Sequence, residues 1–505
     1  MNYKAIEILK TLTKSEMLDC GIFMNSAYTN PSPKVAALFS KLAGYYPEFN
    51  MDGVTEESLS KEIAPHLKYN RSSMKNLFAD LAEALDSYLV SISFSRRLPD
   101  KWDMLREEYF RRNLWKLVER DIKVAESHMR SLDKQGVDHF FDTSKLLVDK
   151  YNYLAVKKHK SGAQYANELR SIFDERAMNI AGFFTKELVK QYENIHALNR
   201  TFAPPPQKSF MDKLFDEIDF KGLIKMLAKE VKGGYLSATF EIHEAMFTCF
   251  SGPGDEANYF RYKKILIRLT DNLLFDDVRF HLIRLVRYCM NKIEEHGGIS
   301  PFDKELFNVY KFIVEKGYYK PSRMPYMPVE FFRTVILQSL KLKEFGYASY
   351  IIENFKNELQ SDKRNNMELY AKALLCFHSK QYDEAMENCQ KVKLNHFLLK
   401  FEIKDLMLMT AYEKGLDGNM RTLLDAYRHL LKNDSTLSKK EKAKYKNFLT
   451  AISKLNYARN SGNISECAVV EKLLEDDISN KVWLMEKVRE LNAASKRKKV
   501  KRVKR

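Results

Sequence analysis

The sequence has few residues that interrupt helices. Its 505 residues include 13 prolines and 18 glycines, beside plentiful leucine, lysine, glutamate and alanine. Because proline and glycine disfavour helix interiors, their scarcity favours helix over sheet. Apolar residues make up 45% and charged residues 30% of the chain, which argues against general disorder. We therefore expect an all-α protein with several domains or one long repeat array.

Long apolar runs are missing as well. No stretch of about 18 apolar residues is present, so the sequence predicts no transmembrane helix. The first twelve residues, MNYKAIEILKTL, place Lys4, Glu7 and Lys10 within the apolar run, which favours a short amphipathic helix over a signal peptide. No two cysteines form a CxxC pair, and we expect buried thiols in a reducing, cytoplasmic environment. The six cysteines are Cys20, Cys249, Cys289, Cys376, Cys389 and Cys467.

Motifs that indicate catalysis or cofactor binding are also lacking. The chain contains no GxxxxGK[ST], GxGxxG or GxSxG sequence. His243 and Glu244 begin a zincin-like pattern, but Phe247 stands where the second histidine is needed. Cys376 and His378 are two positions apart, so they do not share a helix face. We predict no catalytic residue, metal or cofactor, and an enzyme assembled from distant residues is a third hypothesis.

Helix-start signals and prolines divide the chain into predicted segments. Residues 13–16 (TKSE) have capping-box spacing, and Ser32 places a cap residue before a proline suited to the first helical position. Residues 204–206 are three prolines without backbone N–H donors, so residues 203–206 (APPP) predict a bend or linker. The predicted segments are an N-terminal helical bundle (1–99), a long-helix region (100–200), a proline-rich linker or bend (201–209), a helical region (210–325), helix-pair repeats (326–455), C-terminal helices (456–494) and a disordered basic tail (495–505).

An offset of 37 residues relates two parts of the helix-pair region. Residues 344–348 (EFGYA) match residues 381–385 (QYDEA), and each lies in a predicted turn between two helical patterns. A third two-helix unit is expected at 406–431, with its turn at 415–418. A unit of two helices cannot bury its apolar face alone, so we expect stacked copies that form an α-solenoid.

The second copy resembles a tetratricopeptide repeat (TPR). Ala373 and Ala385 occupy positions where that family uses small residues, which let paired helices pack closely. Tyr382 fits the turn aromatic of the family, and Leu369 fits its opening apolar position. The resemblance covers about a quarter of the chain. Departures from the family pattern are Lys372, Cys376, Phe397 and, in the first copy, Ile336.

The TPR resemblance also implies a ligand-binding face. In that family the first helix of each pair lines the concave surface. Candidate ligand-facing residues implied by the resemblance are Arg333, Lys341, Tyr370 and His378. The alternative is that these are ordinary surface residues.

The whole chain also resembles a group of uncharacterised bacterial all-helical proteins. The segments that carry this resemblance are residues 25–30 (NSAYTN), 38–39 (LF), 46–47 (YP), 425–429 (DAYRH), 445–448 (YKNF) and 483–487 (WLMEK). No activity is established for that group. The resemblance therefore implies an all-helical architecture and assigns no functional residues.

Positive charge is concentrated at the end of the sequence. The net charge is +17, eight of these charges lie in the last ten residues, and the other 495 residues carry +9. Such a tail is a candidate for contact with nucleic-acid phosphates through counterion release. A solubilising terminus, an acidic protein surface and anionic lipid are the alternatives. The candidate phosphate-contacting residues are Lys496, Arg497, Lys498, Lys499, Lys501, Arg502, Lys504 and Arg505.

The sequence thus supports two leading hypotheses about function. The first is a non-enzymatic interaction scaffold that presents a helical-repeat surface to a protein partner. The alternative is a protein associated with nucleic acid, RNA among the candidates, that uses the basic tail.

Overall fold

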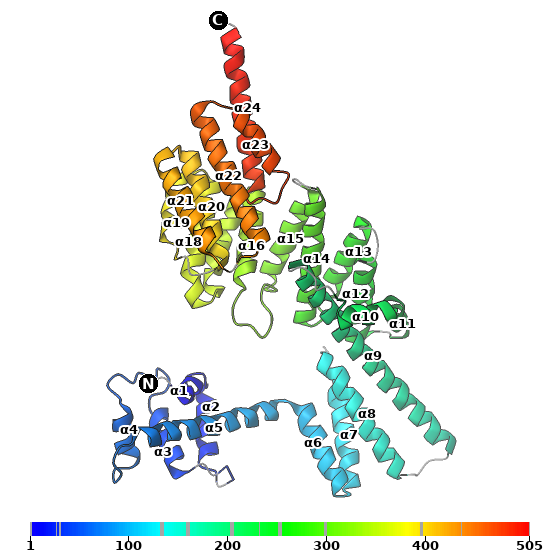
Figure 1. Cartoon of the computed structure of the whole chain (residues 1–505). Coiled ribbons are helices and arrows are strands. Elements are labelled where there is room, and N and C mark those ends of the chain that lie inside the picture. Colours follow the sequence, from blue (N-terminus) through cyan, green and yellow to red (C-terminus); the bar gives the residue numbers. More distant parts are fainter. Residues whose placement is uncertain are drawn as a thin grey trace. The chain divides into compact units, whose positions relative to one another are not determined.

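The computed structural model of the chain is helical, and the part of the chain that it describes contains no strand. This confirms the predicted all-α class. The chain divides into two compact units, Met1–Phe220 and Lys221–Arg505 (Figure 1). The structure describes residues 3–26, 28–29, 32–131, 136–157, 162–201, 207–231, 233–250, 255–296, 300–393, 397–435 and 437–503, with side chains except those of residues 196–201, 397–398 and 496–503.

Unit 1 begins with a bundle of five helices. They are α1 (Lys4–Leu9), α2 (Lys14–Met24), α3 (Pro33–Ala43), α4 (Glu56–Ile63) and α5 (Arg71–Arg96). The 26-residue helix α5 contacts each of the other four. All five helices contribute to one buried apolar cluster, in which Leu9, Leu38 and Leu81 are fully buried.

The predicted starts of α2 and α3 are confirmed by their caps. The Thr13 hydroxyl accepts a hydrogen bond from the Glu16 backbone N–H, and the Glu16 carboxylate accepts one from the Thr13 N–H at 2.9 Å. The Ser32 hydroxyl accepts from the backbone of Val35, and Pro33 occupies the first turn of α3. These local bonds satisfy N–H groups that the helix leaves unpaired.

The remaining helices of unit 1 continue directly from the bundle. They are α6 (Leu98–Arg111), α7 (Trp115–Ser131), α8 (Val137–Lys157), α9 (Gly162–Thr201) and α10 (Phe210–Glu217). Arg106 of α6 is 3% exposed and binds Asp149 of α8 at 2.7 Å and Asp121 of α7 at 3.1 Å. This buried guanidinium joins three helices through two carboxylates.

The predicted proline-rich linker falls between α9 and α10. Residues 202–206 lie outside the described residues, so its conformation is not described. Helix α10 begins at Phe210, as predicted, with Ser209 as its cap. It packs back on α9, where the rings of Phe215 and Tyr192 stack at 3.9 Å. The compact unit therefore continues past the prolines to Phe220.

Unit 2 contains the other helices. They are α11 (Phe220–Glu230), α12 (Gly234–Phe250), α13 (Glu256–Leu269), α14 (Phe275–His296), α15 (Pro301–Glu315), α16 (Val329–Lys341), α17 (Phe345–Phe355), the 3-10 helix η1 (Lys356–Glu358), α18 (Ser361–His378), α19 (Tyr382–Lys391), α20 (Phe397–Lys414), α21 (Asp417–Asn433), α22 (Lys439–Ser461), α23 (Ser465–Leu473) and α24 (Lys481–Val503).

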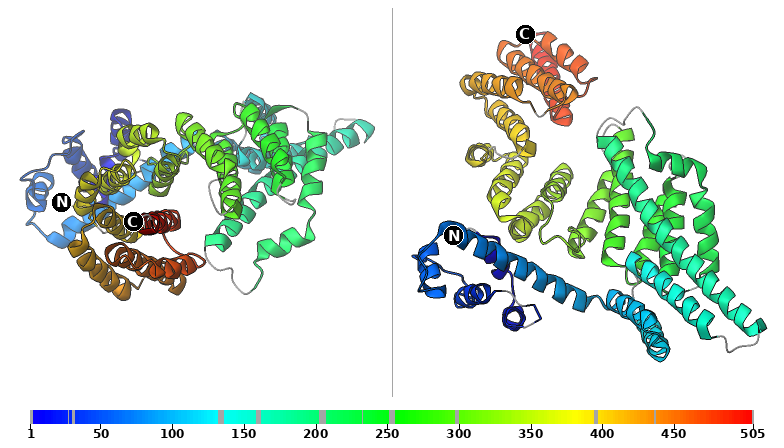
Figure 2. Two further views of the ribbon diagram at one scale, coloured as in Figure 1. Left: turned by 90° about the horizontal axis from the view of Figure 1, so that it is seen from above. Right: turned by 60° about the horizontal axis from the view of Figure 1, so that its bottom comes forward.

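From α16 onward, helices pack in pairs and the pairs pack in succession. Each first helix packs on its own second helix, as α18 does on α19. In addition, α16 contacts α18, α18 contacts α20, α20 contacts α22, and α22 contacts α24. The first helices therefore form one layer. Figure 2 shows these helices, coloured yellow-green to red, following one another in a curved row.

The turns inside three of these pairs share one backbone geometry. Lys343, Lys380 and Gly415 all adopt left-handed conformations, with φ of 61°, 63° and 69°. In each turn the next N–H bonds to the carbonyl five residues earlier, as in a Schellman cap. These bonds join Glu344 to Ser339 (2.9 Å), Gln381 to Cys376 (2.8 Å) and Leu416 to Ala411 (3.0 Å). The first two turns are related by the 37-residue offset found in the sequence.

Three alanines of the paired helices lie in the core. Ala348, Ala373 and Ala385 are all fully buried, and Ile336 in the first copy is buried as well. Such positions allow close approach because a methyl group occupies little space between two helices. Helix α22 continues to Ser461, beyond the predicted end of the repeats at 455.

The prediction of a disordered tail at 495–505 is wrong as far as Val503, because helix α24 extends to that residue. Alanine, lysine and arginine have high helix propensity, so this sequence can continue the backbone ladder. The side chains of the eight tail residues, and residues 504–505 altogether, lie outside the described part of the chain. Across the described residues, every helix is too short or too polar to cross a membrane.

Candidate functional site

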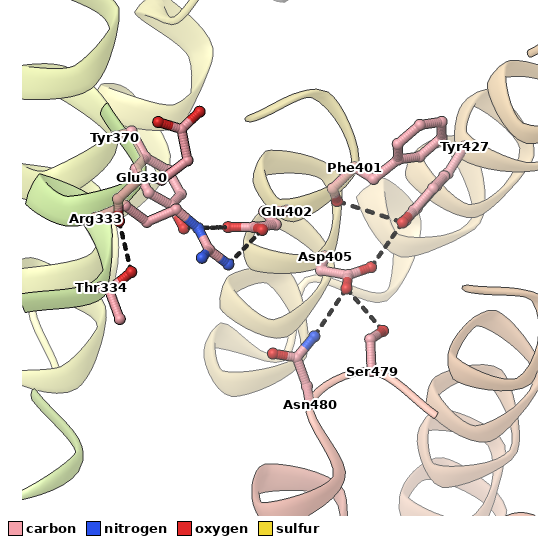
Figure 3. Close-up of polar contacts among 10 residues, drawn as sticks. All are labelled: Glu330, Arg333, Thr334, Tyr370, Phe401, Glu402, Asp405, Tyr427, Ser479 and Asn480. Atoms are coloured by element: carbon pink, nitrogen blue, oxygen red, sulfur yellow. Dashed lines mark hydrogen bonds and ion pairs between the residues drawn. The ribbon is translucent and has the colours of Figure 1, made fainter. Parts of the chain in front are cut away.

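Two of the four residues predicted to face a ligand meet at one carboxylate. Arg333 of α16 donates to Glu402 of α20, with its Nε 2.8 Å from Oε2, and the Tyr370 hydroxyl of α18 donates to the same oxygen. Figure 3 shows both side chains pointing toward Glu402. Tyr370 is 2% exposed, so its ring lies inside the layer of first helices and not on its surface.

The charges around Glu402 are matched within the protein. Burial and the neighbouring Glu402 charge raise the pKa of Tyr370, so its hydroxyl stays protonated and donates. Burial alone would lower the pKa of Arg333, but hydrogen bonding to Glu402 and its charge raise it. The ion pair spans from α16 to α20, past the intervening first helix α18. The Glu402 side chain thereby links the first helices of three successive helix pairs.

The other two predicted residues lie elsewhere. Lys341, at the end of α16, binds Asp303 of α15 at 2.6 Å, and Asp303 itself is fully buried. Burial tends to raise the pKa of Asp303, but bonds from Lys341, the Ser300 backbone and Gln338 lower it overall. His378 is exposed at the end of α18. The four residues therefore do not converge on one site.

A second buried carboxyl links α20 to the segment that leads into α24. Asp405 is 3% exposed and accepts three hydrogen bonds, each of 2.8 Å, from the Tyr427 hydroxyl, the Ser479 hydroxyl and the Asn480 amide (Figure 3). Burial, helped by the charge of Glu402, raises the pKa of Asp405 to about 7, although the three donors oppose this shift. Sequence reasoning missed this group because its partners are 22, 74 and 75 residues away.

The start of α24 makes further polar contacts with α20. The Trp483 indole N–H donates to Glu413 at 2.8 Å, and Lys487 binds the same carboxylate at 2.8 Å. The Trp483 ring also packs edge-on against Tyr412 at 5.4 Å. Helix α24 is therefore held against α20 at both the Asp405 and the Glu413 positions.

The helices α12, α13 and α14 bury a compact polar cluster. The Tyr262 hydroxyl lies 2.6 Å from His281 Nδ1, and the ring of His281 lies 5.2 Å from that of His243. All three side chains are buried. In the sequence, Phe247 stands where a second metal-binding histidine would be needed beside His243. In the structure the neighbouring histidine is His281, which is 38 positions away. Among the described residues no group of three or more His, Cys, Asp or Glu side chains could hold a metal ion.

Five aromatic rings form a continuous strip over α15, α17 and the loop that follows α15. Neighbouring ring centroids lie 5.2 to 5.8 Å apart. In order, the rings are Phe307, Tyr347, Tyr350, Phe355 and Tyr319. Tyr350 is 46% exposed in the middle of the strip. We call these five residues the aromatic strip.

The aromatic strip is bordered by three ion pairs. They are Lys304–Glu344 (2.7 Å), Lys311–Glu315 (3.8 Å) and Lys320–Glu358 (2.7 Å). The three lysines also lie 5.0 to 6.0 Å from the centroids of Phe307, Tyr347 and Tyr319. The strip thus has an apolar centre and a charged but balanced border. Sequence reasoning did not identify it, because its members come from three separate segments.

The cysteines agree with the expectation of buried thiols. Five are buried, Cys376 is half-buried, and all six are free. Burial raises the pKa of Cys20 to about 12, so that this thiol is not ionised at neutral pH.

Comparison of the chain with protein-family models, with curated proteins and with solved structures gives no match. Any function must therefore be argued from the residues themselves.

Proposed function

We propose that unit 2 is a non-enzymatic protein–protein interaction scaffold, built as a TPR-like α-solenoid from α16 onward. Two observations support the solenoid: first helices contact one another in succession, and three turns share one geometry. Stacked pairs offer a partner a surface that a single pair is too small to provide.

The aromatic strip is the observation that carries the proposal. Tyrosine is enriched at the centres of protein interfaces, where it adds a large apolar area and a polar hydroxyl. Tyr350 has this position, half-exposed between Tyr347 and Phe355. The surrounding ion pairs match the polar rim that excludes water from such a centre. Because Phe307 is buried, we expect the partner to lie over Tyr350 and the half-buried rings beside it.

The four first-helix candidates have secondary roles in this proposal. Arg333 and Tyr370 hold the layer together through Glu402, and Lys341 is bonded to Asp303. His378 is exposed and remains the member of the set that a partner can contact directly.

The test compares two exposed tyrosines in the full-length chain. Tyr350→Ala truncates the centre of the strip, whereas Tyr457→Ala truncates a tyrosine of α22 that is 55% exposed and outside the strip. A partner captured from the native host should be lost with the first variant and kept with the second. With the purified partner, the dissociation constant should rise about 30-fold or more, as for a hot-spot residue worth about 2 kcal/mol. A partner that binds both variants equally would contradict the role of the strip, and failure of the wild-type chain to retain any partner would contradict the scaffold.

A further inference from the structure

A group of lysines surrounds the place where α20, α21 and α22 come together. Helix α22 begins with the sequence KKEKAKYK, and lysines at the end of α21 and the start of α20 lie beside it. We call this group the α22 basic patch. Its members are Lys400, Lys432, Lys439, Lys440, Lys442, Lys444 and Lys446.

Asp434 shows that these segments meet. Its carboxylate binds Lys400 of α20 at 2.5 Å and accepts the Leu437 backbone N–H at 3.0 Å, while its carbonyl accepts Lys442 of α22. The Asp434 side chain is almost fully buried by these contacts. The bonds bring lysines from α20 and α22 to the end of α21, beside Lys432.

The carboxylates within the patch are too few to balance its lysines. Asp434 is buried under Lys400, and Glu441 folds back to accept the Ser438 backbone N–H at 2.8 Å. Seven lysines against these two carboxylates leave a net charge of +5. This is more than half of the +9 that the chain carries outside its last ten residues. The patch therefore carries a local excess of positive charge.

Four lysines of the patch point into solvent. Lys432, Lys439, Lys440 and Lys446 are exposed, and no carboxylate of the described residues lies within ion-pair distance of them. Lys439 and Lys446 are seven positions apart on α22, so they share one face of the helix. The patch ends near Asn447, whose amide donates to the carbonyl of Asp477 in an acidic loop.

The composition of the patch narrows the class of anion. It contains lysine alone, which binds phosphate as a point charge and cannot make the bidentate contacts that arginine makes with carboxylate or phosphate. Between residues 400 and 456 the described chain exposes no large apolar side chain that could insert into a bilayer. The Tyr445 ring is stacked on Phe401 at 5.0 Å, so it is not a platform for an unpaired base.

We propose that the α22 basic patch binds the phosphate backbone of double-stranded nucleic acid without sequence preference. This binding is independent of the aromatic strip and goes beyond the proposed scaffold function. Each phosphate contact should contribute about 0.9 to the slope of log K against log salt concentration. The four exposed lysines alone would therefore give a slope of about −4.

The test measures binding of random-sequence duplexes of about 20 base pairs by fluorescence anisotropy across a salt series. The full-length chain is compared with Lys439→Glu/Lys446→Glu and with the control Lys225→Glu/Lys229→Glu. The control changes the net charge equally at two exposed lysines of α11. The tail is the same in all three proteins, so differences between them report on the patch.

The patch variant should bind the duplex at least about tenfold more weakly than the wild type at 0.1 M salt. Its slope of log K against log salt concentration should be about 2 smaller in magnitude, whereas the affinity and slope of the control should stay close to those of the wild type. If the glutamates unfold the protein, Lys439→Gln/Lys446→Gln should give about half the effect. Comparing DNA and RNA duplexes identifies which nucleic acid supplies the phosphates. The proposal would be overturned if the patch variant and the control lost the same affinity for the duplex, or if the wild type did not bind the duplex. It would also be overturned if the wild type bound poly-glutamate as tightly as the duplex.

Discussion

Replacing Asp405 with asparagine tests how the protein accommodates a buried carboxyl between α20 and α24. Burial raises the pKa of Asp405 from 3.8 to about 7. Between these two pH values, Asp405 is therefore protonated in the folded state and ionised in the unfolded chain. The resulting stability is fully present below about pH 4, falls as the pH rises, and is gone above about pH 7.

The size of the effect follows from the shift. A shift of about 3 pH units at about 1.4 kcal/mol per unit corresponds to a loss of about 4 kcal/mol between pH 4 and pH 8. Asparagine has the same shape and does not ionise, so Asp405→Asn should remove this dependence. Its amide has only one acceptor oxygen, so it cannot accept from Tyr427 on one side and from Ser479 and Asn480 on the other, which should cost about 1 kcal/mol at every pH. The variant should thus be slightly less stable at pH 4 and about 3 kcal/mol more stable at pH 8.

Trp483 gives a local signal for this measurement. It is the tryptophan of unit 2, and its ring packs on Tyr412 of α20. Urea unfolding followed by Trp483 fluorescence, in a Trp102→Phe/Trp115→Phe background, reports on the contact between α20 and α24. Ser479→Ala serves as a control, because it removes one donor but keeps the carboxyl and should keep the pH dependence. Parallel pH curves for the wild type and Asp405→Asn would refute the reasoning.

Two further predictions concern the helix pairs. Glu402→Gln should destabilise unit 2 by about 1–2 kcal/mol, because it leaves the partly buried Arg333 guanidinium without its counter-charge. A double-mutant cycle of Glu402→Gln with Arg333→Met should give a coupling energy of about 1 kcal/mol. Strictly additive effects of the two substitutions would argue against the ion pair. Ala385→Leu should lower stability by about 1–3 kcal/mol by overfilling the crossing of α18 and α19. Gly346→Ala is the matched small change, since an added Cβ meets no atom within 4 Å, and it should leave thermal stability unchanged or raise it slightly.

Local features of the fold could be predicted from the sequence because their causes lie within a few residues. The caps at Thr13 and Ser32 and the start of α10 depend on side chains that bond to the adjacent turn. The 37-residue offset could be found because residues 344–348 and 381–385 have similar sequences, and the turns directly before them have similar backbone geometry. The end of α24 was missed because charge alone suggested disorder, although lysine and arginine are good helix formers.

The candidate surfaces depend on contacts that the sequence does not encode locally. A helical pattern identifies which residues share a face, but it does not show what the face meets. Tyr370 was therefore expected to face a ligand, whereas α20 supplies Glu402 to bond it. Likewise, no local signal links Tyr350 to Tyr319, whose rings lie on either side of Phe355 in the aromatic strip.

The sequence by itself determined that this protein is helical and where three of its helices start, and it predicted that two of its helix pairs repeat. These properties come from backbone propensity and from interactions across one or two turns. The tertiary structure decided which polar groups are buried, because burial depends on neighbours tens of residues away. It alone placed Asp405 among Tyr427, Ser479 and Asn480, and it alone gathered the lysines of α20, α21 and α22 around Asp434.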